Sequence, residues 1–457
     1  MDAGIGVGGL SLAKDEVSSS KFDVFSPIEY ETSIKEVAEL DIHPKSTATS
    51  MGPFTFTALA DPEKWTDCES IRLHGRMRIV KKSGTDVTKL TAADNIGTVD
   101  NIFHSLWSNV RVSLNNTEIT DPSGKWYAYK AFLETKLSYS SKSKETILSS
   151  RGYAQDTAGK FNDFGTPAND DKAAVKSQNE GWLTRKGWFK DGNWVSFCIN
   201  LHSDITTLRN YLPPGVQLDF EFERNSDEFC LLGPKPTGHT YAIELENLHL
   251  TMKRLKPSED IQKFWNQSIK NGEKARMAID RSVLKKPTVS ANKSDLSIYN
   301  VISGRQGPDQ VVVGVLDEEA HNGAIDKNPF EFKDFDITEC SIIVDGQHEP
   351  RKMYKMNKDN NDTADIWANF LENTGVQTDD REFGITKDDY FGGTFLLAWD
   401  RTPDKCNRYH RHIMPGGTID LHLKSSKPLT KTATIIVYAT YSTDLTLSGT
   451  NVEKYLF

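Results

Sequence analysis

The chain of 457 residues is longer than most single domains, and its formal net charge is −9. A protein whose main task is to grip nucleic-acid phosphates needs clustered Lys and Arg, so this acidic balance argues against that role. Hydrophobic residues at 37 % and aromatic residues at 10 % argue against a disordered chain. Length and composition therefore indicate two globular domains of ordinary size.

The N-terminal sequence and the cysteines indicate a reducing compartment. Residues 1–20 are rich in Gly and Ser, so we expect a flexible arm. They lack the basic and apolar regions of a signal peptide, so we do not expect one. No run of about 18 apolar residues occurs, and we expect no membrane span. Five cysteines lie far apart with no C-x-x-C pair, which is typical of ordinary part-buried thiols without a disulfide framework. They are Cys68, Cys198, Cys230, Cys340 and Cys406.

The first half of the chain reads as β structure with two short helices. Apolar and polar residues alternate over 71–79 and, most cleanly, over 216–224, which predicts half-buried strands. Residues 110–119 alternate on both sides of an Asn-Asn pair that tolerates the positive φ of a tight hairpin turn. Short helices are predicted over 99–107 and 125–137. Further strands are predicted over 54–57, 194–201 and 243–252, the last with a bulge at Glu246-Asn247.

Two polar connections interrupt this pattern. Residues 140–192 form a long polar segment that, inside a β domain, is either functional or a tower of loops. A helix is predicted to begin at 256–260 with Ser258 as its N-cap, and we place the connection between two domains there. The Gly- and Pro-rich segment 233–238 is the alternative boundary.

The second half repeats the organisation of the first. Its predicted strands are 311–316, 341–345, 394–398, 418–423 and 433–441, and its largest polar loop is 351–388. We therefore expect an arm at 1–20, a first β domain at 21–262 and a second at 263–457. Periodicity alone indicates two β-sandwiches and leaves jelly-roll and immunoglobulin-like topologies both open.

Several segments, in the right order along the chain, resemble the double jelly-roll major capsid proteins of Polinton (Maverick) elements and adintoviruses. The most specific is Asn-Pro-Phe-Glu-Phe at 328–332, followed by Val-Asp-Gly at 344–346. The other segments are 101–119, 127–137 with 155–159, 201–204 with 212–216, 304–315, and 399–404 with 415–417. The resemblance extends from about residue 50 to the C-terminus. The arm and the loops at 140–192 and 351–388 depart from the family pattern.

This resemblance implies an all-β fold of two tandem eight-stranded jelly rolls with short helices and long loop insertions. It implies a homotrimer of pseudo-hexagonal outline that tiles an icosahedral shell around a double-stranded DNA genome. The implied partners are neighbouring capsomers, a single jelly-roll penton protein and minor capsid proteins, with DNA enclosed but not read by sequence. The implied location is the virion capsid, assembled inside the host cell in the nucleus or cytoplasm.

The candidate metal ligands form incomplete sets. His410 and His412 alternate on a predicted strand and could share a metal, but no third ligand is evident nearby. The acidic runs 359–362 and 379–380 could bind Ca²⁺, yet they lack the glycine and the terminal Glu of a calcium loop. We therefore expect neither metal nor cofactor.

The candidate catalytic and binding residues are also incomplete. His202, Ser203 and Asp204 have the composition of a hydrolase triad without a nucleophile elbow or oxyanion glycine motif, so we expect no enzyme. A basic cluster beside the domain connection could face a packaged genome, although a charged surface explains it equally: Arg276, Arg281, Lys285 and Lys286. The alternative function is a host-recruited, capsid-like sandwich of lectin or adhesin type. That function predicts sugar-stacking aromatics such as Trp182, Trp188 and Trp194.

Overall fold

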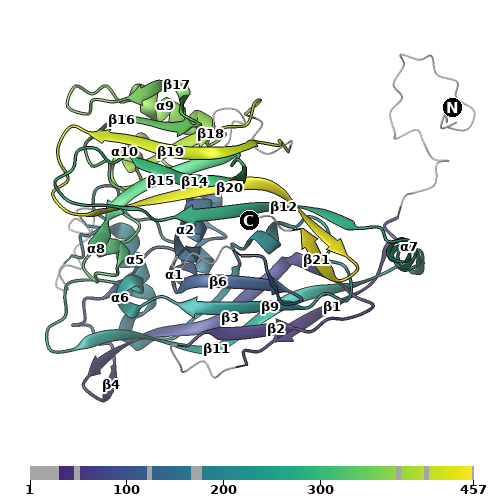
Figure 1. Cartoon of the computed structure of the whole chain (residues 1–457). Coiled ribbons are helices and arrows are strands. Elements are labelled where there is room, and N and C mark those ends of the chain that lie inside the picture. Colours follow the sequence, from purple (N-terminus) through teal and green to yellow (C-terminus); the bar gives the residue numbers. More distant parts are fainter. Residues whose placement is uncertain are drawn as a thin grey trace, which may run out of the picture.

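The computed structural model describes residues 30–45, 52–120, 126–165, 178–376, 382–405 and 411–454. Its strands form four antiparallel sheets that lie as successive layers, two from each half of the chain (Figure 1). The predicted arm at 1–20 lies outside the described residues. Within them, no strand of the first half pairs with a strand of the second.

The first half forms two facing sheets and a short ladder. One sheet is ordered β1 (Ile34–Ile42), β11 (Thr240–Pro257), β3 (Trp65–Ser83) and β4 (Asp86–Lys89), and β8 (Val195–Asn200) also pairs with β3. The other is ordered β2 (Phe54–Ala58), β9 (Leu218–Arg224), β6 (Trp107–Leu114) and β7 (Thr117–Glu118). The ladder joins β5 (Gly97–Thr98) to β10 (Leu231–Leu232). These elements confirm the strands predicted from alternation.

The second half has the same plan. Its larger sheet is ordered β12 (Ala275–Lys285), β20 (Ala433–Ser448), β15 (Gln310–Asp317) and β18 (Leu396–Asp400), and β13 (Thr288–Val289) and β21 (Asn451–Lys454) also pair with β20. Its smaller sheet is ordered β14 (Ile298–Gln306), β19 (Pro415–Ser425), β16 (Ile337–Val344) and β17 (Gln347–Lys355). The five strands predicted here are all present. The long strands β1, β12, β14 and β17 were not predicted, nor were the short strands β4, β5, β10, β13 and β21.

Local sequence signals explain the turns and the paired registers. Asn115 and Asn116 adopt φ of 44° and 67° between β6 and β7, which is the left-handed backbone that a two-residue hairpin turn requires. The predicted bulge in β11 occurs beside Asn247, whose φ is 56°. On β9 the apolar residues face the core, where Phe220 lies opposite Phe56 of β2. The alternation of the sequence thus sets which face of each strand is buried.

The helices are short and lie mainly between strands. They are α1 (Ile102–Ser105), α2 (Tyr127–Ser138), α3 (Ser141–Glu145), α5 (Glu180–Trp188), α6 (Asp227–Cys230), α7 (Glu259–Lys270), α8 (Glu318–His321), α9 (Ala364–Asn373) and α10 (Lys387–Phe391). Single 3₁₀ turns are η2 (Ser149–Arg151), η3 (Lys190–Gly192) and η4 (Asp204–Thr207). α7 begins directly after Ser258, as predicted, although the Ser258 side chain makes no capping hydrogen bond. α1 lies within its predicted helix, and α2 ends one residue beyond its predicted range. None of the helices in the described ranges has the length and apolar character needed to cross a bilayer.

Two long polar insertions, 140–192 and 351–388, carry helices in their described residues. α3 and α5 lie within 140–192, and α9 and the start of α10 lie within 351–388. The two insertions contact each other: the Gly159 amide donates to the Gly392 carbonyl, and the Lys144 ammonium donates to the Phe383 carbonyl. Figure 1 shows α5, α9 and α10 toward one end of the molecule and α7 at the opposite end. The helices of the insertions and α7 therefore lie at opposite ends of the molecule.

Candidate functional site

The residues with the composition of a hydrolase triad do not assemble into one. His202 Nδ1 lies 2.7 Å from Glu134 Oε2 and not beside Asp204. The Asp204 carboxylate is buried, pairs with Lys130 and accepts a hydrogen bond from the Ser282 hydroxyl at 2.9 Å. Ser203 Oγ is buried and makes no hydrogen bond to any described residue. His202 and Asp204, although close in sequence, therefore bind different residues in the structure.

These partners belong to a polar junction that joins the two halves through α2. Glu134 of α2 accepts hydrogen bonds from His202 and from the Tyr438 hydroxyl of β20, the latter at 2.8 Å. Lys130, one helical turn earlier, lies 3.8 Å from the same carboxylate. Burial alone would raise the pKa of Glu134, but Lys130 and His202 lower it to about 2. The junction thus holds an ionised carboxylate between segments of both halves.

We expect Glu134→Gln to destabilise the protein in a pH-dependent way. The folded-state pKa is depressed, so the carboxylate stabilises the fold fully above about pH 4.5, and this contribution is lost as pH falls toward about 2. The loss in unfolding free energy is expected to reach about 3 kcal/mol at pH 7 and to shrink steadily below pH 4.5. Urea unfolding of both proteins between pH 3 and pH 7 measures it. A difference that does not change with pH would contradict the role of the charge.

A second buried network lies around Arg185 of α5. This side chain is fully buried, pairs with Asp156 and donates from Nε to the Thr98 carbonyl at 2.9 Å. The other oxygen of Asp156 accepts from Asn328 Nδ2 at 2.8 Å. Nearby, burial raises the pKa of Asp100, and Lys136 and Arg185 oppose that rise. The network ties the first insertion to the start of the Asn-Pro-Phe-Glu-Phe segment in the second half.

Aromatic side chains complete the junction. Phe330 lies parallel to Phe132 of α2, with ring centroids 4.5 Å apart and planes at 10°. It also meets Tyr129 and Phe229 edge to face, at 5.6 Å and 5.9 Å. The Tyr129 hydroxyl lies 3.0 Å from His321 Nδ1. The segments 127–137, 155–159, 201–204 and 328–332, which carry the resemblance, therefore meet one another in three dimensions.

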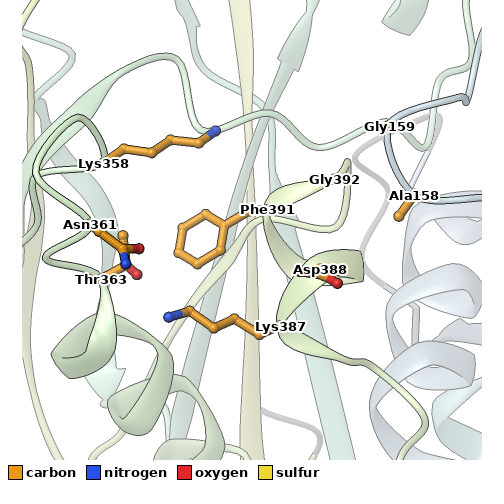
Figure 2. Close-up of a pocket in the computed structure, with 9 residues that line it drawn as sticks. All are labelled: Ala158, Gly159, Lys358, Asn361, Thr363, Lys387, Asp388, Phe391 and Gly392. Carbon is orange, nitrogen blue, oxygen red and sulfur yellow. The ribbon is translucent and has the colours of Figure 1, made fainter.

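A surface cavity of about 520 Å³ lies where the two insertions meet (Figure 2). Ala158 and Gly159 line it from the first half, and Lys358, Lys387 and Phe391 line it from the second. Figure 2 shows the Phe391 ring between the two lysine side chains. The residues that line this cavity include the charged side chains Lys358, Lys387 and Asp388, and no histidine or cysteine.

The predicted metal ligands are not brought together. His412 pairs with Asp404 at 2.8 Å, and its predicted partner His410 lies outside the described residues, as do Asp379 and Asp380. Asp362 forms part of a small loop bridge with Asn357. Across the described parts of the chain, no three His, Cys, Asp or Glu side chains are placed to hold an ion together.

The predicted sugar-stacking tryptophans are not arranged as a platform. Trp182 is fully buried, and its indole donates to the Leu232 carbonyl at 2.8 Å. Trp194 is half-buried, with the Arg78 guanidinium 4.6 Å from its ring centre. Trp188 packs partly buried against the hydrophobic core. The three indole rings thus make their contacts with other residues of the protein.

The predicted basic cluster lies along β12 and its end. Arg276 and Lys285 are exposed, Arg281 lies 5.8 Å from the Tyr441 ring centre, and Lys286 follows the strand half-buried. The four residues are spread along one strand of the larger second-half sheet. They form a charged surface without a defined pocket.

Known proteins were compared with the whole chain. No family model matches it. The uncharacterized protein F54H12.2 of Caenorhabditis elegans is 19 % identical over 277 residues, and the match spans 61 % of this chain and 61 % of that relative. The Sputnik virophage structure superposes with a TM-score of 0.62 over 97 % of this chain and 93 % of that one, at 10 % identity. The chain is a double jelly roll.

Two further double jelly rolls support this assignment. The Faustovirus major capsid protein matches with a TM-score of 0.55 over 93 % of each chain, at 9 % identity. The mavirus major capsid protein matches with a TM-score of 0.54 over 98 % of this chain and 97 % of its own, also at 9 % identity. The double jelly-roll fold expected from the resemblance is confirmed, and the immunoglobulin-like alternative is excluded.

Proposed function

We propose that this chain is a major capsid protein, a structural shell subunit and not an enzyme. The observation that carries the proposal is the match of nearly the whole double jelly roll to two viral major capsid proteins and to the Sputnik virophage structure. The buried Asp204 and Arg185 networks support a structural role, because their charges are paired inside the protein.

The subunit's shape supports assembly as a trimer. Two sandwiches lie side by side in each chain, so three chains arranged head to tail give six lobes and a pseudo-hexagonal outline suited to an icosahedral shell. Obligate contacts of this kind bury more than about 2,000 Å². Several large apolar side chains are exposed and available for such contacts. They include Tyr30, Val37, Leu59, Phe264 and Ile413.

We propose the domain division as 21–262 and 263–457, preceded by an arm at 1–20. It is supported by the strands up to β11 and those from β12 onward, which pair only within their own groups in the described chain. The boundary falls inside α7, the helix between the two groups.

We propose further that the protein belongs to a Polinton- or adintovirus-type element with a double-stranded DNA genome. The ordered family-like segments support this assignment, as does a similar sequence in an animal, the nematode protein. The proposed partners are neighbouring capsomers, a single jelly-roll penton and minor capsid proteins. The proposed location is the virion capsid, assembled inside the host cell around DNA that is not read by sequence.

The test is the solution mass of the purified chain by light scattering, with negative-stain images of the same peak. We expect three chain masses and a hexagonal outline. A monodisperse monomer at micromolar concentration would contradict the shell role. It would favour the alternative of a capsid-like binding protein, which glycan arrays would then examine.

A further inference from the structure

Four potential metal ligands form one row across the outer face of the five-stranded sheet. His74 of β3 lies directly opposite His249 of β11 on one side and Cys198 of β8 on the other. His43 follows the last paired residue of β1 and lies beside His249, with ring centroids 5.8 Å apart. Residues directly opposite on neighbouring antiparallel strands share a face, so the row is fixed by strand register.

The row lies on the face turned away from the core. On β3 the flanking Leu73 and Gly75 are buried, whereas His74 is half-buried. Cys198 is also partly exposed, unlike Cys68, Cys230 and Cys340, which are buried. An ion from solvent can therefore reach this thiol.

Two of these ligands are already at metal-binding spacing. His74 Nε2 lies 3.7 Å from Cys198 Sγ. Zinc bonds of about 2.0–2.1 Å to nitrogen and about 2.3 Å to sulfur, at a tetrahedral angle, place the two ligand atoms about 3.6 Å apart. The present spacing thus needs almost no adjustment, and within the described chain the other hydrogen-bond partner of this nitrogen is the Thr251 hydroxyl at 3.0 Å.

The candidate for a third ligand is His249, which lies beside His74. His249 stacks on His74 with centroids 4.8 Å apart and planes at 10°, and its Nδ1 lies 3.0 Å from the Asn247 carbonyl. In this stacked position three ligands do not converge, in agreement with the absence of a three-ligand group among the described side chains. Among the described residues, His249 Nε2 makes no hydrogen bond, and the ring is partly exposed.

We propose that His74, Cys198 and His249 bind a divalent transition metal of the zinc class, with solvent as the fourth ligand. Imidazole nitrogen and thiolate sulfur are the ligands that such borderline-soft ions prefer. Binding releases the thiol proton to solvent and leaves a thiolate–metal bond. The carboxylates of Glu39 and Asp41 lie near His74 and favour a cation, whereas Arg72 opposes it. The site does not depend on whether the chain builds a shell.

The test is titration of the reduced, full-length protein with Co²⁺, followed by competition with Zn²⁺. We expect one equivalent of Co²⁺ to produce a thiolate-to-cobalt charge-transfer band that Zn²⁺ abolishes. Cys198→Ser should remove the band, and His74→Ala or His249→Ala should weaken Zn²⁺ binding at least about tenfold. Circular dichroism of each variant verifies that it is folded.

Two matched variants separate this site from its rivals. Cys406→Ser changes the one cysteine that is followed closely by His410 and His412, and it should leave the band intact. His422→Ala changes a histidine whose ring lies 6.0 Å from that of His348 in the second half, and it should leave Zn²⁺ affinity unchanged. A band that survives Cys198→Ser, a band lost in Cys406→Ser, or no binding by the folded protein would each overturn the proposal.

Discussion

Arg185→Met is expected to lower the unfolding free energy by about 3–5 kcal/mol. The guanidinium is fully buried between Asp156 and Asp100, and it also donates to the Thr98 carbonyl. Methionine fills much of the same space but leaves two buried carboxylates without their shared cation. Removing one partner of a buried pair costs more than the pair itself contributes, because the remaining charge stays desolvated.

Urea unfolding at fixed protein concentration measures this loss, since any assembly makes apparent stability depend on concentration. Arg305→Met is the matched control, because Arg305 is exposed on β14, and its effect should stay within about 0.5 kcal/mol. Equal effects of the two substitutions would show that the buried network does not stabilise the fold.

Phe330→Ala is expected to cost about 3–5 kcal/mol, the usual range for removing a fully buried phenylalanine. Its ring stacks on Phe132 and meets Tyr129 and Phe229, so its removal opens a cavity at the contact between the halves. The same loss should weaken the hold of α2 on the second half. Hydrogen exchange would report this change as faster exchange at α2.

Tyr299→Ala serves as the comparison for an aromatic truncation, because Tyr299 is 77 % exposed on β14. Its effect on urea unfolding should be within about 0.5 kcal/mol. A cost below about 1 kcal/mol for Phe330→Ala would mean that the surrounding rings close the space, and the stack would then not be the main apolar contact of the junction.

The sequence predicted the strands in which apolar residues alternate clearly with polar ones or form a short continuous run. β12 was missed because its alternation is broken at Ser282, a buried polar residue that donates to Asp204 across the junction. β1 was missed because it is an edge strand with a mostly exposed first half, and its apolar alternation is confined to Ala38, Leu40 and Ile42 at the end of the strand. In both β12 and β1, the residue types are explained only by the segments that each strand contacts in the folded structure.

The helices of the two insertions were hidden by polar composition. α5 includes Arg185 as a buried residue, and a sequence pattern counts arginine as surface. Long-range sites were hidden for a different reason. His74 and Cys198 are 124 positions apart, and only the register of β3 with β8 makes them neighbours. The five cysteines read from the sequence gave no sign that one of them faces a histidine.

The position of α2 also bears on how the protein can evolve. This helix follows the hairpin of β6 and β7 in the first half, yet it also contacts the second half. Lys130 pairs with Asp204, which binds Ser282 of β12, and Glu134 accepts a hydrogen bond directly from Tyr438 of β20. A substitution in α2 therefore affects contacts with both halves of the chain. Loops at either end can change in length or sequence independently. Where α2 contacts the second half, a substitution on one side requires a matching substitution on the other.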